Sequence, residues 1–261
     1  MQVLAKENPQ HTYFFTDVQE LDICDEHAVR ACIADNQIDV VVNCAAFTAV
    51  DKAEDNEELC RKLNEEAPGI LARAAQAYGA AMIQVSTDYV FDGTAHIPYK
   101  EDCMPCPNSV YGFTKLGGEK EVMQNCEKAM VIRTAWLYSI YGNNFVKTMI
   151  RLGRERESLG VVFDQIGTPT YAAINQGIVP GIYHFSDEGV CSWYDFTVAI
   201  HRIAGITTCK VSPLHTDEYP AKAPRPHYSV LDKTKIKNTF GIHIPHWEES
   251  LKVCIDKLNA Q

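Results

Sequence analysis

AMIQVSTDYVFDG, at residues 81–93, decides the fold class. Its first part, Ala81–Val85, is a short apolar run of the kind that forms a buried strand. Two hydroxyl residues, Ser86 and Thr87, follow directly, and the stretch then ends in a glycine turn. A second stretch, YGFTK at residues 111–115, begins a helix-like continuation. A strand, a turn and a helix in this order predict one unit of an α/β sheet.

The pair Tyr111 and Lys115 gives this unit a candidate chemistry. On a helix, a spacing of four residues places both side chains on one face. A free tyrosine has a pKa of about 10, and a neighbouring ammonium lowers this pKa because it favours the phenolate. Tyr111 could then exchange a proton with a substrate oxygen that the Thr87 hydroxyl polarises, while a hydride moves to or from carbon. The alternative is an exposed helix pair without function, because this spacing also arises by chance.

Composition indicates a globular protein without a nucleic-acid or membrane surface. Of the 261 residues, 46% are hydrophobic and 22% are charged, which allows a substantial core. The 24 basic residues are outnumbered by 34 acidic ones and form no basic run, so nucleic acid is not an expected partner. No apolar run reaches membrane length, and we expect no signal peptide. The ten cysteines follow no disulfide framework and the histidines show no metal-ligand spacing, so we expect a reduced, cytoplasmic protein without a metal site.

Further patterns predict a doubly wound parallel sheet, which is a Rossmann-like α/β fold, with a smaller C-terminal substrate-binding lobe. The predicted strands are His11–Phe15, Ile38–Cys44, Ala81–Val85, Ala129–Leu137 and Gly181–Phe185. The predicted helices are Asp25–Asn36, Glu57–Tyr78 with a kink or break at Pro68, and two that begin near Gly142 and Ser192. We expect residues 1–140 to form the dinucleotide-binding domain. Residues 141–261 would mainly form the substrate lobe, with 161–186 returning to the sheet.

The motifs resemble those of the extended short-chain dehydrogenase/reductases, and within them the enzymes that act on dTDP-linked deoxysugars. The resemblance runs from about Asp17 to the C-terminus. Besides STDYVFDG and YGFTK, it rests on VNCAAFTAVDKAE (42–54), RTAWLY (133–138), DQIGTPT (164–170) and RPHYSVLD (225–232). It implies a reductase that uses NADPH or NADH to convert dTDP-4-dehydro-L-rhamnose, a dTDP-4-keto-6-deoxy sugar, to dTDP-L-rhamnose. A homodimer is a further expectation.

The resemblance also implies roles for residues of this chain. Tyr111 would be the proton donor, Lys115 would lower its pKa and hold the nicotinamide ribose, and Thr87 would orient the keto oxygen. The other implied cofactor contacts are Asp22, Ile23, Ala46, Phe47 and Thr48. The implied substrate contacts are Thr87, Asp88, Trp136 and Arg225. Three alternatives stay open: Asp22 as a turn or cap residue, Trp136 as a core aromatic, and Arg225 as a solvated loop residue.

Two departures from the family pattern concern the sheet. A nucleotide-binding sheet should open with a strand and a glycine-rich turn, whereas the first glycine of this chain is Gly69. We therefore expect the full protein to contain a further strand and a glycine-rich turn upstream of Met1; otherwise the chain binds cofactor poorly. Relatives also carry most of a helix where this chain has only Tyr171–Gly177, and we expect the full protein to contain it.

Two other functions stay open at this point. One is a non-catalytic NADP-binding partner, because the regulatory subunit of eukaryotic methionine adenosyltransferase resembles these reductases. The other is a nucleotide-sugar epimerase or dehydratase of the same superfamily. A dehydratase would want an acid/base pair beside the catalytic hydroxyl, where this chain has Asp88 followed by Tyr89.

Overall fold

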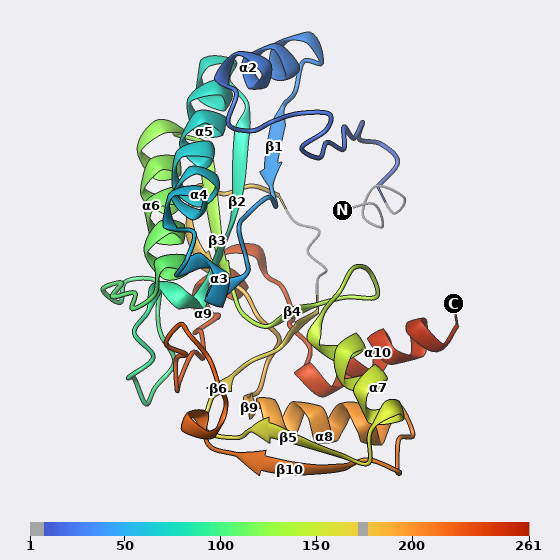
Figure 1. The fold of residues 1–261 in the computed structure, drawn as a ribbon. Helices are drawn as coiled ribbons and strands as arrows, with labels where there is room; N and C mark the ends of the chain where they lie inside the picture. The colour runs from blue at the N-terminus through green and yellow to red at the C-terminus, as the bar shows by residue number, and fades with distance from the viewer. Residues whose placement is uncertain (1–7, 172–176, 261) are drawn as a thin grey trace.

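The centre of the fold is a parallel sheet with the strand order β1-β2-β3-β8 (Figure 1). The structure, a computed structural model, describes residues 8–171 and 177–260. The four strands are β1 (Val40–Asn43), β2 (Ala81–Thr87), β3 (Ala129–Thr134) and β8 (Gly181–His184). In their register Asn43 pairs with Gln84, Thr87 with Thr134, and Arg133 with His184. All four carboxyl ends therefore lie at one edge of the sheet, where ligands bind in folds of this kind.

Helices α2 (Glu26–Asp35), α5 (Ala67–Ala77) and α6 (Val110–Asn125) cover one face of this sheet (Figure 1). Asp25 caps α2 by accepting a hydrogen bond from the Ala28 backbone, and Ser109 caps α6 in the same way from Gly112. The buried core between helices and sheet consists of small and aliphatic side chains, including Val29, Leu71, Ala75, Met82, Val122 and Val131. Such a core brings the helices close enough to the strands to fix the position of α6.

The long helix predicted over Glu57–Tyr78 is present but interrupted. It consists of α4 (Glu57–Arg61), a π-helical turn η1 (Lys62–Glu66) and α5, which ends at the cap residue Tyr78. Pro68 lacks a backbone N–H, so the carbonyl of Asn64 loses its ordinary helical partner. Gly118 of α6 packs against this carbonyl so closely that a Cβ at Gly118 would collide with it. The predicted break at Pro68 is confirmed, and it allows the two helices to pack closely.

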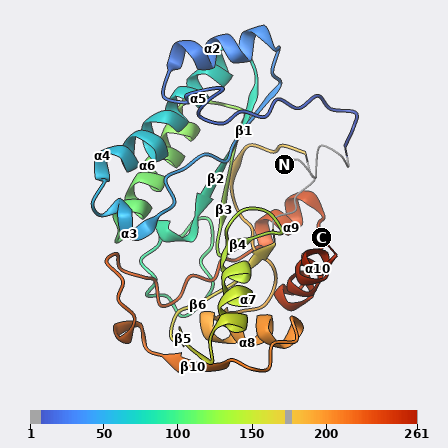
Figure 2. The same cartoon turned by 45° about the vertical axis from the view of Figure 1, so that its right-hand side comes forward.

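A second lobe lies beyond the carboxyl edge of the sheet (Figure 2), and it has a core of its own. Its elements are α7 (Phe145–Glu155), α8 (Trp193–Ile203), α10 (Trp247–Asn259) and the parallel pair β5 (Ser158–Val162) and β10 (Lys210–Leu214). Ser192 and Asp195 form a capping box at the start of α8, as the predicted serine cap requires. The remaining elements are α3 (Val50–Ala53), η2 (Asp88–Val90), β4 (Leu137–Tyr138), β6 (Ile166–Gly167), β7 (Thr170–Tyr171), β9 (Cys191–Ser192), η3 (Thr216–Glu218) and α9 (Thr234–Phe240).

Two strand predictions need correction. The prediction of a strand at His11–Phe15 is wrong: this segment has no regular secondary structure and Phe14 and Phe15 are half exposed. A strand needs a hydrogen-bonded neighbour, and the described residues provide none for it. The strand predicted over Ala129–Leu137 ends at Thr134, because Trp136 adopts a positive φ of 48°. The missing helix expected at Tyr171–Gly177 falls mostly on residues 172–176, outside the described residues.

The segment 225–231 passes between two of the sequence motifs and joins them. On one side Tyr228 donates its backbone N–H to the carbonyl of Gly93 (3.1 Å), and on the other Ile166 donates to the carbonyl of His227 (2.7 Å). Gly93 has a φ of +79°, and a Cβ there would lie 2.5 Å from Cα of Pro226. Only glycine permits this approach. The motifs STDYVFDG, DQIGTPT and RPHYSVLD, which are far apart in sequence, therefore meet at one place.

Candidate active site

Thr87 and Asp88 stand at the carboxyl end of β2, at the edge of the sheet. Both are buried, and the Thr87 hydroxyl donates to Oδ1 of Asp88 (2.9 Å) while it accepts from the backbone N–H of Tyr89 (3.2 Å). The Tyr89 and Tyr111 rings meet edge to face with their centroids 5.4 Å apart. The strand end and the first turn of α6 therefore bring together the residues that the sequence predicted for proton transfer.

Burial controls the proton affinity of Tyr111. It raises the pKa of the Tyr111 phenol above its ordinary value, and a hydrogen bond with the Thr87 side chain opposes this only in part. The phenol is thus protonated at neutral pH, which suits a proton donor. The prediction that Lys115 lowers the pKa of Tyr111 is not supported by a contact between them in the described part of the chain. Instead, Nζ of Lys115 donates to the carbonyl of Val85 (2.6 Å).

Lys115 itself is almost fully buried. Burial lowers the pKa of its ammonium to about 8, and the carboxylate of Glu119, one helical turn further on, opposes this shift. An ammonium has three N–H donors, and the bond to Val85 uses one. Lys115 therefore keeps donors for further acceptors, and its contact with the ribose stays a prediction.

A buried ion pair lies one helical turn along α6 from Lys115. Glu119 and Arg133 are each 2% exposed, with Nη2 of Arg133 2.7 Å from Oε2 of Glu119 and its Nε 2.9 Å from Oε1. The hydroxyl of Ser86, next to Thr87, donates to the same carboxylate (2.5 Å). This pair ties α6 to the carboxyl ends of β2 and β3.

His184 completes the buried network as a neutral ring. Burial and the Arg133 charge lower the pKa of His184 to about 3, so the ring is uncharged at neutral pH. Its Nε2 lies 3.4 Å from Nη1 of Arg133 and its Nδ1 lies 3.0 Å from the carbonyl of Tyr99. These partners fit the tautomer with its proton on Nδ1, which accepts from arginine and donates to the carbonyl.

The loop at the carboxyl end of β1, which contains Ala46, Phe47 and Thr48, is held at Phe47 by Asn64. The Asn64 side chain accepts from the backbone N–H of Phe47 (2.8 Å) and donates to its carbonyl (3.0 Å). It also lies 3.3 Å from the hydroxyl of Thr114 on α6. Asn64 belongs to the π-helical turn, and such turns are common at functional sites. It was missed in the sequence, where nothing marks a π-helical turn.

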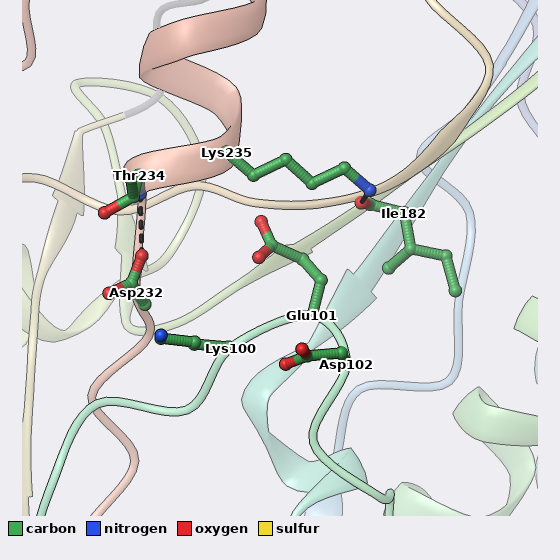
Figure 3. A pocket seen from close by; sticks show the side chains of 7 residues that line it. All are labelled: Lys100, Glu101, Asp102, Ile182, Asp232, Thr234 and Lys235. Carbon is green, nitrogen blue, oxygen red and sulfur yellow. Dashed lines mark hydrogen bonds between the residues drawn. The ribbon is translucent and has the colours of Figure 1, made fainter.

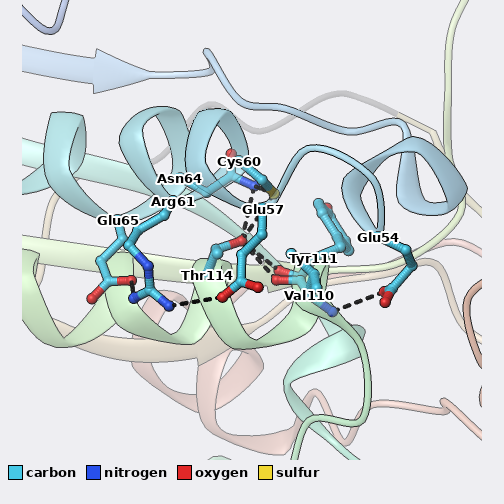
Figure 4. A network of polar contacts seen from close by, with 9 residues as sticks. All are labelled: Glu54, Glu57, Cys60, Arg61, Asn64, Glu65, Val110, Tyr111 and Thr114. Carbon is cyan, nitrogen blue, oxygen red and sulfur yellow. Dashed lines mark hydrogen bonds and ion pairs between the residues drawn. The ribbon is translucent and has the colours of Figure 1, made fainter.

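Glu54 is a second residue that the sequence did not identify. It accepts a hydrogen bond from the backbone N–H of Val110 (2.9 Å) and so supports the N-terminus of α6 (Figure 4). The signal available was its place in the motif VNCAAFTAVDKAE, but the carboxylate has no partner nearby in sequence. Together Asn64 and Glu54 fix the β1 loop and α6 relative to each other, as a cofactor lying between them would require.

Asp22 and Ile23 take simpler positions. Asp22 is exposed, and its Oδ1 accepts from the backbone N–H of Cys24 (2.9 Å), which is the turn role left open above. Ile23 packs against the core under α2 and α5. A contact of either residue with an adenine stays a prediction.

Trp136 is packed against other aromatic residues, and its role as a substrate platform stays a prediction. It stacks on Trp193 with ring centroids 3.5 Å apart at 12°, and a Cβ at Gly167 would lie 2.7 Å from its Cε2. Packing of this kind fixes the indole and explains the unusual backbone of Trp136. The side chain is only partly buried, so a rigid aromatic surface remains accessible.

Arg225 is not a solvated loop residue. Its Nη2 forms an ion pair with Oδ2 of Asp51 (2.6 Å), and the side chain is 18% exposed. Its positive charge also lies close enough to Tyr89 to oppose the rise that burial causes in the pKa of the Tyr89 phenol. The structure therefore places Arg225 next to the Tyr89–Tyr111 pair.

A separate surface pocket of about 560 Å³ lies between the loop after Tyr99 and the start of α9 (Figure 3). Its walls carry both signs of charge, with Lys100 and Lys235 beside Glu101 and Asp232. Nζ of Lys235 donates to the carbonyl of Ile182 (2.7 Å). None of the residues predicted for catalysis or binding lines it, so we assign the chemistry to the sheet edge instead.

Asp88 makes the stability of the folded protein depend on pH. Burial raises the pKa of its carboxyl to about 6, although hydrogen bonds from Ser229 and Thr87 oppose this, and its Oδ2 has no hydrogen-bond partner among the described residues. Because the folded-state pKa exceeds the ordinary value, the group's stabilising contribution is complete below about pH 4 and is lost as pH rises through 6.

We expect the unfolding free energy of Asp88→Asn to fall less between pH 5 and pH 7.5 than that of the unaltered protein. The effect should be about 1.4 kcal/mol, because the window contains one pH unit below the pKa of about 6, each unit corresponds to about 1.36 kcal/mol, and the variant has no carboxylate to bury. Urea unfolding at several pH values measures it, with the exposed Asp217→Asn as the control. Burial also raises the pKa of Asp187 to about 6, so Asp187 contributes to the change of unfolding free energy with pH in the unaltered protein and in the variant alike. An unchanged slope in Asp88→Asn would mean that Asp88 is charged in the folded protein at all these pH values.

The fold and the site together define a Rossmann-like α/β protein with a threonine, a tyrosine and a lysine gathered at the carboxyl edge of its sheet. The chain belongs to the family described as "RmlD substrate binding domain", whose model matches residues 1–260. Among the described residues, no helix is both long and apolar enough to cross a membrane.

Named relatives agree with this assignment. The chain is 38% identical to dTDP-4-dehydrorhamnose reductase of Escherichia coli (strain K12) over 93% of this chain and 88% of that protein. The crystal structure of a dTDP-4-dehydrorhamnose reductase from Clostridium acetobutylicum superposes with a TM-score of 0.92 and 42% identity, covering 99% of this chain and 95% of the other. The enzyme of Bacillus anthracis str. Ames in complex with NADP superposes with a TM-score of 0.91 and 36% identity, covering 98% and 94%. The predicted family and fold class are confirmed.

Proposed function

We propose that this protein reduces the 4-keto group of dTDP-4-dehydrorhamnose to give dTDP-L-rhamnose, with NADPH or NADH as the reductant. The observation that carries the proposal is the meeting of Thr87, Tyr111 and Lys115 at the sheet edge, in a chain 38% identical over most of its length to a reductase of this name. The reaction adds a hydride to C4 and a proton to its oxygen, so the ketone becomes a secondary alcohol.

The cofactor would lie along the β1 loop, between Ala46–Thr48 and Lys115. The small side chain of Ala46 and the fixed backbone of Phe47 fit a ligand that passes close to the chain. Lys115 has spare donors for the nicotinamide ribose. When bound, the reduced nicotinamide supplies the hydride.

The protein's own residues handle the proton and the orientation of the sugar. Tyr111, which burial keeps protonated, gives its phenolic proton to the oxygen at C4. The hydroxyl of Thr87, which donates to Asp88 in this structure, would turn its single proton to the same oxygen, and Oδ2 of Asp88, which has no hydrogen-bond partner among the described residues, would accept from a sugar hydroxyl. Trp136 would stack on a sugar face, and Arg225 would bind the diphosphate.

The test is the loss of absorbance of NADPH by the full-length protein, with and without dTDP-4-dehydrorhamnose. We expect oxidation only when the sugar nucleotide is present. NADPH binding without sugar-dependent oxidation would favour a non-catalytic binding subunit and refute the reductase. UDP-glucose 4-epimerases resemble this chain at 20% identity or less, which shows the fold alone and favours no epimerase activity here.

Two further expectations follow the same proposal. All ten cysteines are free thiols, which suits the reducing cytoplasm.

A homodimer stays a prediction, and light scattering of the purified protein would decide it by the mass in solution. The exposed side chains of Leu59 and Phe113, which α4 and α6 present at the surface, are the first place to look for the contact.

A further inference from the structure

We propose that Asp51 is a positioning residue for the sugar nucleotide: its carboxylate holds Arg225, and the loop that carries it, in place for the substrate's diphosphate. The inference rests on the proposed function, because it assigns Arg225 to that diphosphate. Asp51 itself need not touch the substrate.

The carboxylate of Asp51 collects three hydrogen bonds from one loop. Its Oδ1 accepts from the backbone N–H groups of Lys222 and Ala223, each at 3.0 Å, and its Oδ2 accepts from Nη2 of Arg225 at 2.6 Å. Burial alone would raise the pKa of Asp51, but the bond from Ala223 and the charge of Arg225 outweigh it and hold the pKa below its usual value. The group is therefore a charged anchor for residues 222–225.

The position of Asp51 links the two halves of the site. It is the second residue of α3, which follows directly on the β1 loop that we assign to the cofactor. Its partners lie more than 170 residues further on, in the loop before α9. The ion pair thus connects α3, next to the β1 loop, to the loop that carries Arg225.

Arg225 is fixed from its other neighbours as well. Pro226, the next residue, packs on Gly93 so closely that a Cβ at Gly93 would not fit. The guanidinium also lies near the Tyr89 phenol, because its charge opposes the burial that raises the pKa of Tyr89 to about 12. The contact of Pro226 with Gly93 therefore fixes the loop on one side. Asp51 fixes the loop backbone and the Arg225 side chain on the other.

One amino group of Arg225 is left over. Its Nη1 is buried and has no hydrogen-bond partner among the described residues, which is costly for a charged donor. A diphosphate oxygen would satisfy it while Nη2 stays on Asp51. Because the guanidinium is already held in one orientation, less conformational freedom is lost when the anion binds.

We expect Asp51→Asn to raise the KM for dTDP-4-dehydrorhamnose by about ten-fold, with kcat changed less than about two-fold. The KM for NADPH should not change, because the variant leaves Asn64 and Lys115 untouched. Asp55→Asn is the matched control: Asp55 lies close by in sequence and pairs with Lys222, but both side chains are exposed. Equal KM values for this control and the unaltered protein are expected.

A double-mutant cycle shows whether Asp51 acts through Arg225. In an Arg225→Ala background, Asp51→Asn should add less than about two-fold to KM. The same ten-fold increase in both backgrounds, or an unchanged KM in Asp51→Asn, would overturn the proposal. A parallel rise in both KM values with a lower midpoint of unfolding would show a merely structural role and would also overturn it.

Binding of dTDP alone separates this inference from the reductase activity. Calorimetry on the full-length proteins should give about ten-fold weaker dTDP binding for Asp51→Asn than for Asp55→Asn. If the unaltered protein binds dTDP but oxidises no NADPH with the sugar nucleotide, the proposed reaction fails while the calorimetric comparison still decides the role of Asp51. Equal dTDP affinities in the two variants would refute that role.

Discussion

Tyr111→Phe should reduce turnover by a factor on the order of 10²–10⁴, the usual contribution of a positioned general acid. The substitution removes the phenolic proton and keeps the ring that packs edge to face on Tyr89. NADPH affinity should be nearly unchanged, because the ring, Lys115 and the β1 loop stay in place. Steady-state assays with dTDP-4-dehydrorhamnose, together with NADPH fluorescence titration, measure the two quantities.

The control for this variant is Tyr141→Phe. Tyr141 is 54% exposed on the loop before α7, so the loss of its hydroxyl should change turnover less than about two-fold. If Tyr111→Phe kept more than a tenth of normal turnover, another group would have to supply the proton, and the assignment of Tyr111 would be wrong.

The largest effect on stability is expected at the buried ion pair. Glu119→Gln leaves the Arg133 guanidinium buried without a counter-charge, and the loss of one partner from such a pair costs about 3–5 kcal/mol. Denaturant unfolding followed by circular dichroism measures the unfolding free energy. The variant Glu119→Gln/Arg133→Met removes both charges and should recover most of the loss.

An exposed pair supplies the comparison. Arg151 and Glu155 on α7 form an ion pair with side chains 59% and 53% exposed, so Glu155→Gln should cost roughly 0–1 kcal/mol. If Glu119→Gln cost no more than this control, the Glu119–Arg133 pair would not be a closed, desolvated contact in solution.

The sequence predicted those features that depend on local patterns. The apolar runs at residues 40–43, 81–85 and 129–134 lie in strands β1, β2 and β3, which pair with one another in parallel as predicted. The helix starts near Asp25 and Ser192 and the break at Pro68 follow from side-chain and backbone chemistry within a few residues. Tyr111, Lys115 and Thr87 were identified on the same grounds, because helix spacing and strand ends fix where they point.

Features that depend on distant partners were not predictable in this way. His11–Phe15 has a strand-like composition, but a strand forms only where another chain segment pairs with it. Asn64 looks like an ordinary helical residue, and its clamp on Phe47 exists only because the helix widens to a π-turn. The partner of Arg225 lies 174 residues away, and no local pattern marks it.

The separation of Asp51 and Arg225 by 174 residues affects the order in which parts of the site form during folding. Closing a flexible loop of 174 residues costs roughly 4–5 kcal/mol of chain entropy beyond the constant cost of closure. The hydroxyl of Thr87 and the carboxyl of Asp88 are neighbours in the chain and carry no such cost. The proposed diphosphate contact Arg225 therefore depends on a long-range chain closure, while the proposed proton donor Tyr111 and its neighbour Thr87 are assembled from one strand and one helix.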